Sequence, residues 1–153
     1  MRNRRIIERT AHAPRIMGTP NKNGFLLLYR SDESYNQLSL EELQGLMRRN
    51  KAWFEQLAAQ GKITTGQALE RMGATISGKN GQFVSDGPFA ESKEAIGGYL
   101  LLNIATLEEA IAIVRTSPGL DGGVSIEVRP VADECPLDAR ARELSREQQL
   151  LAV

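Results

Sequence analysis

The chain has 153 residues, a length that suits one domain or one domain with tails. Hydrophobic residues make up 41% and charged residues 25%, which excludes wholesale disorder. Lys and Arg together number 19, as do Asp and Glu, so the chain has no overall positive field to attract nucleic acid or anionic lipid. The longest apolar stretches, such as residues 25–29, are far too short to span a bilayer, and we expect a cytoplasmic protein.

The chain has few of the side chains that usually serve in catalysis or metal binding. Cys135 is the single cysteine, which excludes an intramolecular disulfide and a cysteine-cluster metal site. His12 is the single histidine, so a Ser-His-Asp or Cys-His arrangement is not available within the rest of the chain. No cluster of carboxylates suggests a metal site, and haem is disfavoured without a histidine ligand. We therefore expect neither a metal nor a cofactor.

Residues 1–22 form a basic N-terminal extension. They hold six basic side chains against one acidic side chain, so this segment carries a charge of +5 and the remainder −5. Three interpretations fit: a flexible tail, with Met17 as the true start; a basic arm that touches nucleic acid; or an organelle transit peptide. The segment lacks the apolar core of a secretory signal. We expect the ordered domain to span 23–132, followed by a C-terminal tail with a short helix over 133–153.

The sequence of the first half of the domain predicts a strand, a helix and two further strands before a hairpin turn. Residues 25–29 form a short apolar run typical of a buried strand. Ser39 and Glu42 have the spacing of a capping box, and the helix that follows should end at Gly61. Its expected apolar face is Leu43, Met47, Phe54 and Leu57, with Leu46 and Trp53 beside it. Strands are expected over 62–68, 74–77 and 82–85, with the hairpin turn at 80–81.

The second half repeats the strand–helix–strand order. An apolar strand is expected around 97–104, and Thr106 and Glu109 form a second capping box whose helix ends near Pro118. Residues 124–129 alternate apolar and polar side chains as a strand does. Two such halves in about 110 residues predict an α+β ferredoxin-like βαββαβ sandwich with a hairpin insert.

Both faces of the expected sheet are apolar, which predicts a homodimer. In the first strand, Leu26 and Leu28 point away from Phe25, Leu27 and Tyr29. In the strand near 97–104, Tyr99 and Leu101 point away from Leu100 and Leu102. Since both helices lie on one face, the other face would expose a large apolar patch, which monomers seldom tolerate. A second copy of the sheet would cover it and enclose a cleft. The alternative cover is the C-terminal segment 139–151, whose strong apolar anchors are only Leu144, Leu150 and Leu151.

The central part of the chain carries a resemblance to a known family. Residues 84–94 read Val-Ser-Asp-Gly-Pro-Phe-Ala-Glu-Ser-Lys-Glu, and Gly97-Gly98-Tyr99 follows them. With the opening strand 25–29 and the closing run 127–131, this pattern resembles the DGPF branch of the YCII-related proteins over residues 23–132. The resemblance implies a ferredoxin-like fold that dimerises as an α+β barrel. It also implies, for some relatives, a His–Asp acid/base pair in the cleft and lyase activity on small molecules.

The resemblance carries over only in part, because the domain has no histidine. Asp86 alone is available as the catalytic residue, and it would need a raised pKa to act as a base near neutral pH. The alternative is that Asp86-Gly87-Pro88 is simply a turn. Glu91 and Lys93 are candidate ligand contacts, or else a solvated ion pair of little energetic value.

The closing strand offers a charged pair to the same cleft. If Ile126 and Val128 face the helices, Glu127 and Arg129 point into the cleft, where the arginine could hold a carboxylate or phosphate. The alternative is a satisfied ion pair at the interface. Tyr29 either lines the cleft as a ligand contact or packs in the core.

Two functions of different classes remain open. The first is binding of a small anionic or polar metabolite in the dimer cleft, with lyase-like chemistry undecided. The second is a non-catalytic regulatory or interaction module, which the resemblance links to sigma-factor signalling because DGPF genes often lie beside those of extracytoplasmic-function sigma factors.

Overall fold

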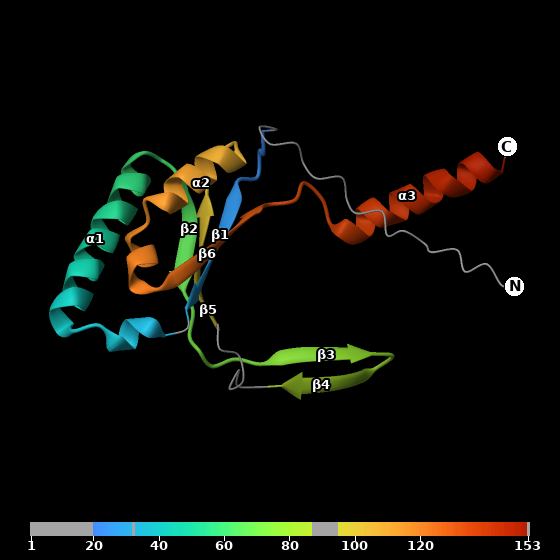
Figure 1. The fold of residues 1–153 in the computed structure, drawn as a ribbon. Coiled ribbons are helices and arrows are strands. Elements are labelled where there is room, and N and C mark those ends of the chain that lie inside the picture. The colour runs from blue at the N-terminus through green and yellow to red at the C-terminus, as the bar shows by residue number, and fades with distance from the viewer. Residues whose placement is uncertain (1–19, 32, 87–94, 153) are drawn as a thin grey trace, which may run out of the picture.

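A computed structural model describes residues 20–31, 33–86 and 95–152, and these form an α+β fold. Its main sheet has four antiparallel strands in the order β2 (Ile63–Ala68), β5 (Ala95–Leu102), β1 (Phe25–Ser31) and β6 (Val124–Pro130). The helices α1 (Leu40–Ala59) and α2 (Leu107–Arg115) lie on one side of this sheet (Figure 1). This order, with one helix after β1 and one after β5, is compatible with the expected ferredoxin-like fold.

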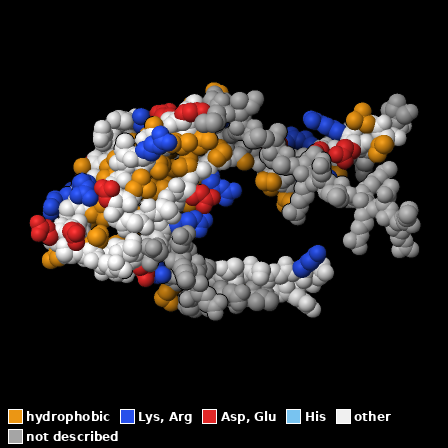
Figure 2. Space-filling model, in the orientation of Figure 1, with side chains coloured by type: hydrophobic (Ala, Val, Ile, Leu, Met, Phe, Trp, Pro, Cys, Tyr) orange, Lys and Arg blue, Asp and Glu red, His pale blue; other side chains and the backbone are white. Residues whose placement is uncertain are grey.

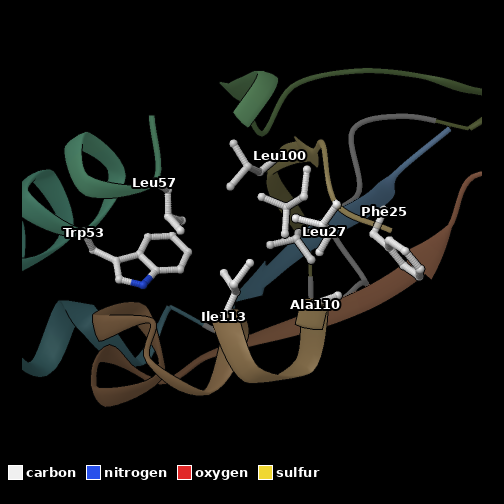
Figure 3. Packing of buried hydrophobic residues seen from close by; sticks show 9 residues of the cluster. Phe25, Leu27, Trp53, Leu57, Leu100, Ala110 and Ile113 are labelled. Atoms are coloured by element: carbon white, nitrogen blue, oxygen red, sulfur yellow. The ribbon is translucent and has the colours of Figure 1, made fainter. Parts of the chain in front are cut away.

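The core lies between the helices and one face of the sheet. Figure 3 shows Trp53 and Leu57 of α1 and Ile113 of α2 directed toward Leu27 of β1. Leu27 and Leu102 are fully buried, and Phe25 and Leu100 are nearly so. The alternation expected for β1 and β5 is thus confirmed, because the residues between these face the other side of the sheet.

The start and the end of α1 follow the expected signals. Ser39 Oγ accepts from the Glu42 amide at 3.3 Å, and the Glu42 carboxylate accepts from the Ser39 amide at 2.7 Å, which completes the capping box. Hydrogen bonding to the Glu42 carboxylate, first by the Ser39 backbone amide and then by the Ser39 side chain, lowers the pKa of Glu42. Gly61 follows the helix with a φ of 68°.

The apolar face of α1 is rotated from the expected one. Met47 and Phe54 were expected to face the core, yet they are 68% and 36% exposed. Trp53 takes the core position instead, since its indole Nε1 donates to Thr116 Oγ1 at 2.9 Å at the end of α2. The rings of Phe54 and Trp53 pack edge to face, with their centroids 5.0 Å apart.

Two further expectations need correction in the second half. The strand expected around 97–104 lies two residues earlier, and Ile104 is buried in the loop that follows. At α2, Thr106 Oγ1 accepts from the Glu109 amide, but the Glu109 carboxylate pairs with Lys62 Nζ at 3.3 Å rather than closing a capping box. The interaction with Lys62 joins α2 to the start of β2.

Two elements project from this body past the helix-free side of the sheet (Figure 1). One is the hairpin of β3 (Thr75–Lys79) and β4 (Gln82–Asp86), which turns at Asn80 and Gly81 and forms its own two-stranded sheet. The other is α3 (Pro136–Leu151), which has no buried residue. The C-terminal segment therefore does not cover the sheet. No helix in the described ranges is long and apolar enough to cross a membrane.

The short 3-10 helices η1 (Ser34–Gln37) and η2 (Pro118–Gly122) complete the connections. Before β1, Asn21 is only 3% exposed: its amide donates to the Ala105 carbonyl, its Nδ2 donates to the Val131 carbonyl at 3.0 Å, and its Oδ1 accepts from the Asn23 amide at 2.9 Å. The ordered fold thus takes in a residue that the sequence assigns to the N-terminal extension.

Candidate functional site on the helix-free face

The helix-free face of the main sheet has apolar residues in the middle and polar residues at both edges. The pairing of the four strands places side chains in two rows that run from β6 across β1 and β5 to β2. The first row is Arg129, Leu26, Leu101 and Thr65, and the second is Glu127, Leu28, Tyr99 and Gln67. Because strands lie about 4.8 Å apart, the two polar edges are about 14 Å from one another.

We call Leu26, Leu28, Tyr99 and Leu101 the apolar stripe. All four side chains are partly exposed in the described part of the chain, and none belongs to the core between the sheet and the helices. Their neighbours in sequence, by contrast, form the buried core. The stripe is therefore apolar surface that the described part of the chain leaves open to solvent or to a partner.

An ionic cluster borders the apolar stripe at β6. Arg30 donates to Glu127 Oε2 from Nε at 3.2 Å and from Nη2 at 2.9 Å. The other carboxylate oxygen of Glu127, Oε1, lies 3.7 Å from Arg129 Nε. Figure 2 shows acidic and basic side chains together at this edge. The three residues carry a net charge of +1, and Arg129 is the most exposed of them, at 66%.

The structure brings Glu127 and Arg129 to the face expected for them. Ile126 and Val128 pack against the core, which is the condition for the charged pair to lie on the helix-free side. Arg30 joins them although it was not among the candidate residues. The signal was present in the sequence, since Arg30 follows Leu26 and Leu28 at the same two-residue spacing.

Tyr29 does not share this face. It alternates with Leu28 and Arg30, and it packs against the core beside Ile126. Burial raises the pKa of Tyr29 to about 12, and its hydroxyl has no hydrogen-bond partner within the described ranges. A contact between Tyr29 and a ligand would have to come from the helix side of the sheet.

The remaining candidates belong to the hairpin region. The backbone of Asp86 ends β4 and pairs with Thr75, outside the four-stranded sheet, and its side chain lies outside what the structure describes. Glu91 and Lys93 fall in 87–94, also outside the described residues. Within the described ranges, no group of three or more His, Cys, Asp or Glu side chains could hold a metal ion.

The hollow found among the described residues does not include the ionic cluster. A hollow of about 430 Å³ lies along α3, and none of its lining residues belongs to the sheet: Glu134, Ala139, Arg142, Glu143, Arg146, Glu147 and Leu150. A closed site on the helix-free face would therefore need a second wall.

The fold and this face define a small α+β protein with an open, partly apolar sheet and an arginine-rich edge. The family model of the YCII-related domain matches residues 25–134, and the chain belongs to this family. Uncharacterized protein R00369 of Rhizobium meliloti (strain 1021) is 32% identical over 111 residues, which cover 70% of this chain and 90% of that protein. The family expected from the sequence is thus confirmed.

Proposed function

We propose that this protein binds a small anionic or polar metabolite on the helix-free face of its sheet. The observation that carries the proposal is the cluster of Arg30, Glu127 and Arg129 beside the apolar stripe. Arginine holds carboxylates and phosphates through paired hydrogen bonds. An apolar floor next to such a group is the usual composition of a small-molecule site.

Arg129 is the residue that we assign to the anion. Arg30 already donates twice to Glu127, whereas Arg129 approaches the same carboxylate only at 3.7 Å and is 66% exposed. The exchange of this loose contact for a ligand anion costs little, since exposed ion pairs contribute at most about 1 kcal/mol. The net charge of +1 on the cluster favours an anion over a cation.

A second copy of the chain supplies the missing wall in this proposal. Two sheets that meet face to face would bury the apolar stripe of each copy and enclose the ionic clusters, which is the dimeric α+β barrel expected from the sequence. Two-fold symmetry is the commonest arrangement of soluble oligomers. The clusters would then line a cleft between the sheets rather than an open surface.

Lyase-like acid/base chemistry would require a proton carrier in this cleft, and Asp86 is the residue that the sequence offers. Asp86 comes from the hairpin, so it would approach the ligand from a different part of the fold than the arginines. Asp86→Asn separates the two functions: if Asp86 is the base, ligand binding survives this change and turnover is lost.

A thermal-shift screen with small carboxylates and phosphorylated compounds tests the proposal. A ligand at a hundred times its Kd stabilises the folded state by about 2.7 kcal/mol, which raises the melting temperature. Arg129→Ala should abolish this shift. Arg115→Ala is the matched control, because Arg115 is an exposed arginine on α2, away from the face. A shift that both variants keep would place the ligand elsewhere and contradict the proposal.

A regulatory module is the second candidate function. The observation that favours it is the lack of any histidine in residues 25–134, which removes the usual acid/base side chain from the domain. A non-catalytic protein could use the same open face for a protein partner. Co-purification of an extracytoplasmic-function sigma factor that is lost with Leu28→Glu would support this candidate, and its absence would weigh against it.

A further inference from the structure

The C-terminal helix α3 has a regular row of leucines that the rest of the described fold leaves uncovered. Leu137, Leu144 and Leu151 recur every seven residues and are 79%, 42% and 87% exposed. Ala141 and Gln148 lie between them, each four residues after a leucine. This is the spacing of a coiled-coil seam, with leucine at every d position and Ala or Gln at the a positions.

A helix of this kind needs a partner. α3 has 16 residues, none of them buried, and isolated helices of about this length are marginal in water. The family match ends at residue 134, so the seam lies outside the part of the chain that the family describes. The apolar stripe of the sheet and the seam of α3 are thus two separate uncovered surfaces.

We propose that the seam of α3 pairs with the seam of α3 from a second copy, with the two helices antiparallel. Charge complementarity sets this direction. Arg140 and Glu147 occupy the g positions that flank the seam, and in an antiparallel pair the g positions of the two helices face each other. Each Arg140 would then meet Glu147 of the other helix. In a parallel pair, Arg140 would face Ser145, and this attraction would be lost.

The intrachain contacts of these charges do not prevent the exchange. Arg140 Nη1 lies 2.6 Å from Glu143 Oε2 and 4.0 Å from Glu147 Oε1, with all three side chains more than half exposed. Exposed pairs of this kind are weak and can be exchanged for contacts across a seam.

The fold also presents α3 in a suitable direction. Figure 1 shows α3 projecting past the helix-free side of the sheet, where the proposed function places the second copy. The two-fold axis of a face-to-face dimer lies in the plane between the sheets. A helix that crosses this plane is roughly perpendicular to the axis, so its symmetry mate runs antiparallel to it. Two short helices alone associate weakly. The pairing of the two α3 helices therefore rests on the proposed sheet dimer, which would hold them close together and so raise their effective concentration.

Hydrogen exchange of the full-length protein tests the seam. The backbone amides of α3 should exchange at least about tenfold more slowly in the wild type than in Leu144→Glu, which places a charge in the seam. Leu150→Glu is the matched control, because Leu150 is 79% exposed and lies at a c position, outside the seam of the same helix. The α3 amides of Leu150→Glu should exchange at the same rate as those of the wild type. Equal loss of protection in both variants, or no protection in the wild type, would overturn the proposal.

A distance measurement tests the direction. Cys135 is the only cysteine, is exposed and caps α3, so a spin label reacts there alone. With Ala141 packed against Leu144 of the other helix, the antiparallel pair places the two Cys135 backbones about 23 Å apart along the helix axis. A separation under about 15 Å would indicate a parallel pair, and the absence of any interchain signal would indicate no pair. Either result contradicts the proposal.

Sedimentation of the same labelled sample separates this proposal from the proposed function. A dimer without the interchain signal overturns the helix pairing and leaves the sheet dimer intact. A monomer overturns both.

Discussion

Arg30 on β1 and Glu127 on β6 are joined by two hydrogen bonds to a single carboxylate oxygen, at 3.2 and 2.9 Å. The two residues are diagonal neighbours, because Glu127 lies opposite Leu28 and Arg30 lies opposite Ser125. This pairing holds one arginine in place and leaves the second, Arg129, loosely engaged. The edge of the sheet therefore carries a fixed ion pair and an adjacent arginine that is accessible to a ligand.

Removal of the acid from this cluster should strengthen anion binding. Glu127→Gln takes away the one negative charge between two arginines, so the net charge of the cluster rises from +1 to +2. We expect the Kd for a carboxylate or phosphate found in the thermal-shift screen to fall about fivefold at low salt, since one exposed charge interaction is worth about 1 kcal/mol. Isothermal titration measures this change.

The matched control for this prediction is Glu109→Gln. Glu109 also pairs with a basic side chain, Lys62, but on the helix side of the molecule. Its removal should leave the Kd unchanged. Weaker binding by Glu127→Gln would mean that the carboxylate itself contacts the ligand, and the assignment of the anion to Arg129 would be wrong.

The buried hydroxyl of Tyr29 predicts a loss of stability in alkali. Burial raises the pKa of Tyr29 from 10 to about 12. Between these values the unfolded chain releases a proton that the folded chain keeps, so the free energy of unfolding falls as the pH rises, by about 2 to 3 kcal/mol over the full window. Below pH 10 this contribution is fully present.

Tyr29→Phe should abolish this pH dependence. At pH 8 the variant should be at least as stable as the wild type, because it removes a buried hydroxyl without a hydrogen-bond partner in the described ranges. Urea unfolding followed by fluorescence of Trp53, the only tryptophan, measures both quantities. Parallel curves for the two proteins from pH 8 to 12 would show that Tyr29 does not cause the loss.

The hydrogen bond between Trp53 and Thr116 predicts a measurable loss of stability when it is removed. Thr116 Oγ1 accepts from the indole at 2.9 Å and donates to the Ile113 carbonyl at 2.7 Å, which joins α1 to the end of α2. Thr116→Val keeps the shape but leaves the indole donor without an acceptor, so the free energy of unfolding should fall by about 1 to 2 kcal/mol. Urea denaturation measures this loss.

Thr116→Ser is the control for the core, because it keeps the hydroxyl group. It should be more stable than Thr116→Val. If serine and valine destabilise the protein equally, then the methyl group, and not the hydrogen bond, accounts for the loss.

The sequence alone predicted the parts of the fold that depend on local pattern. Alternation in residues 25–29 separated the two faces of β1, although both are apolar and only the fold shows which one the helices cover. The Ser39–Glu42 spacing identified the start of α1. The face of α1 was wrong because Trp53 and Phe54 are adjacent and both large, and only the partner on α2 decides between them. Such a contact between distant segments leaves no local signal.

The candidate site was predictable in part for the same reason. Alternation within β6 placed Glu127 and Arg129 on the face opposite to Ile126 and Val128, and the structure shows that the apolar pair faces the helices. The role of Arg30 depends on the register between β1 and β6, which are almost a hundred residues apart in the chain. The seven-residue spacing of Leu137, Leu144 and Leu151 is present in the sequence, but only the fold shows that the sheet of the same chain leaves these leucines uncovered.

Sedimentation equilibrium of the purified protein tests the central claim most directly, which is that the apolar stripe binds a second copy. We predict twice the chain mass for the wild type and the single-chain mass for Leu28→Glu, which places a charge in the middle of the stripe. Met47→Glu, at a 68% exposed position on α1, should keep the double mass. A single-chain mass for the wild type at tens of micromolar, or a double mass for folded Leu28→Glu, would contradict the account.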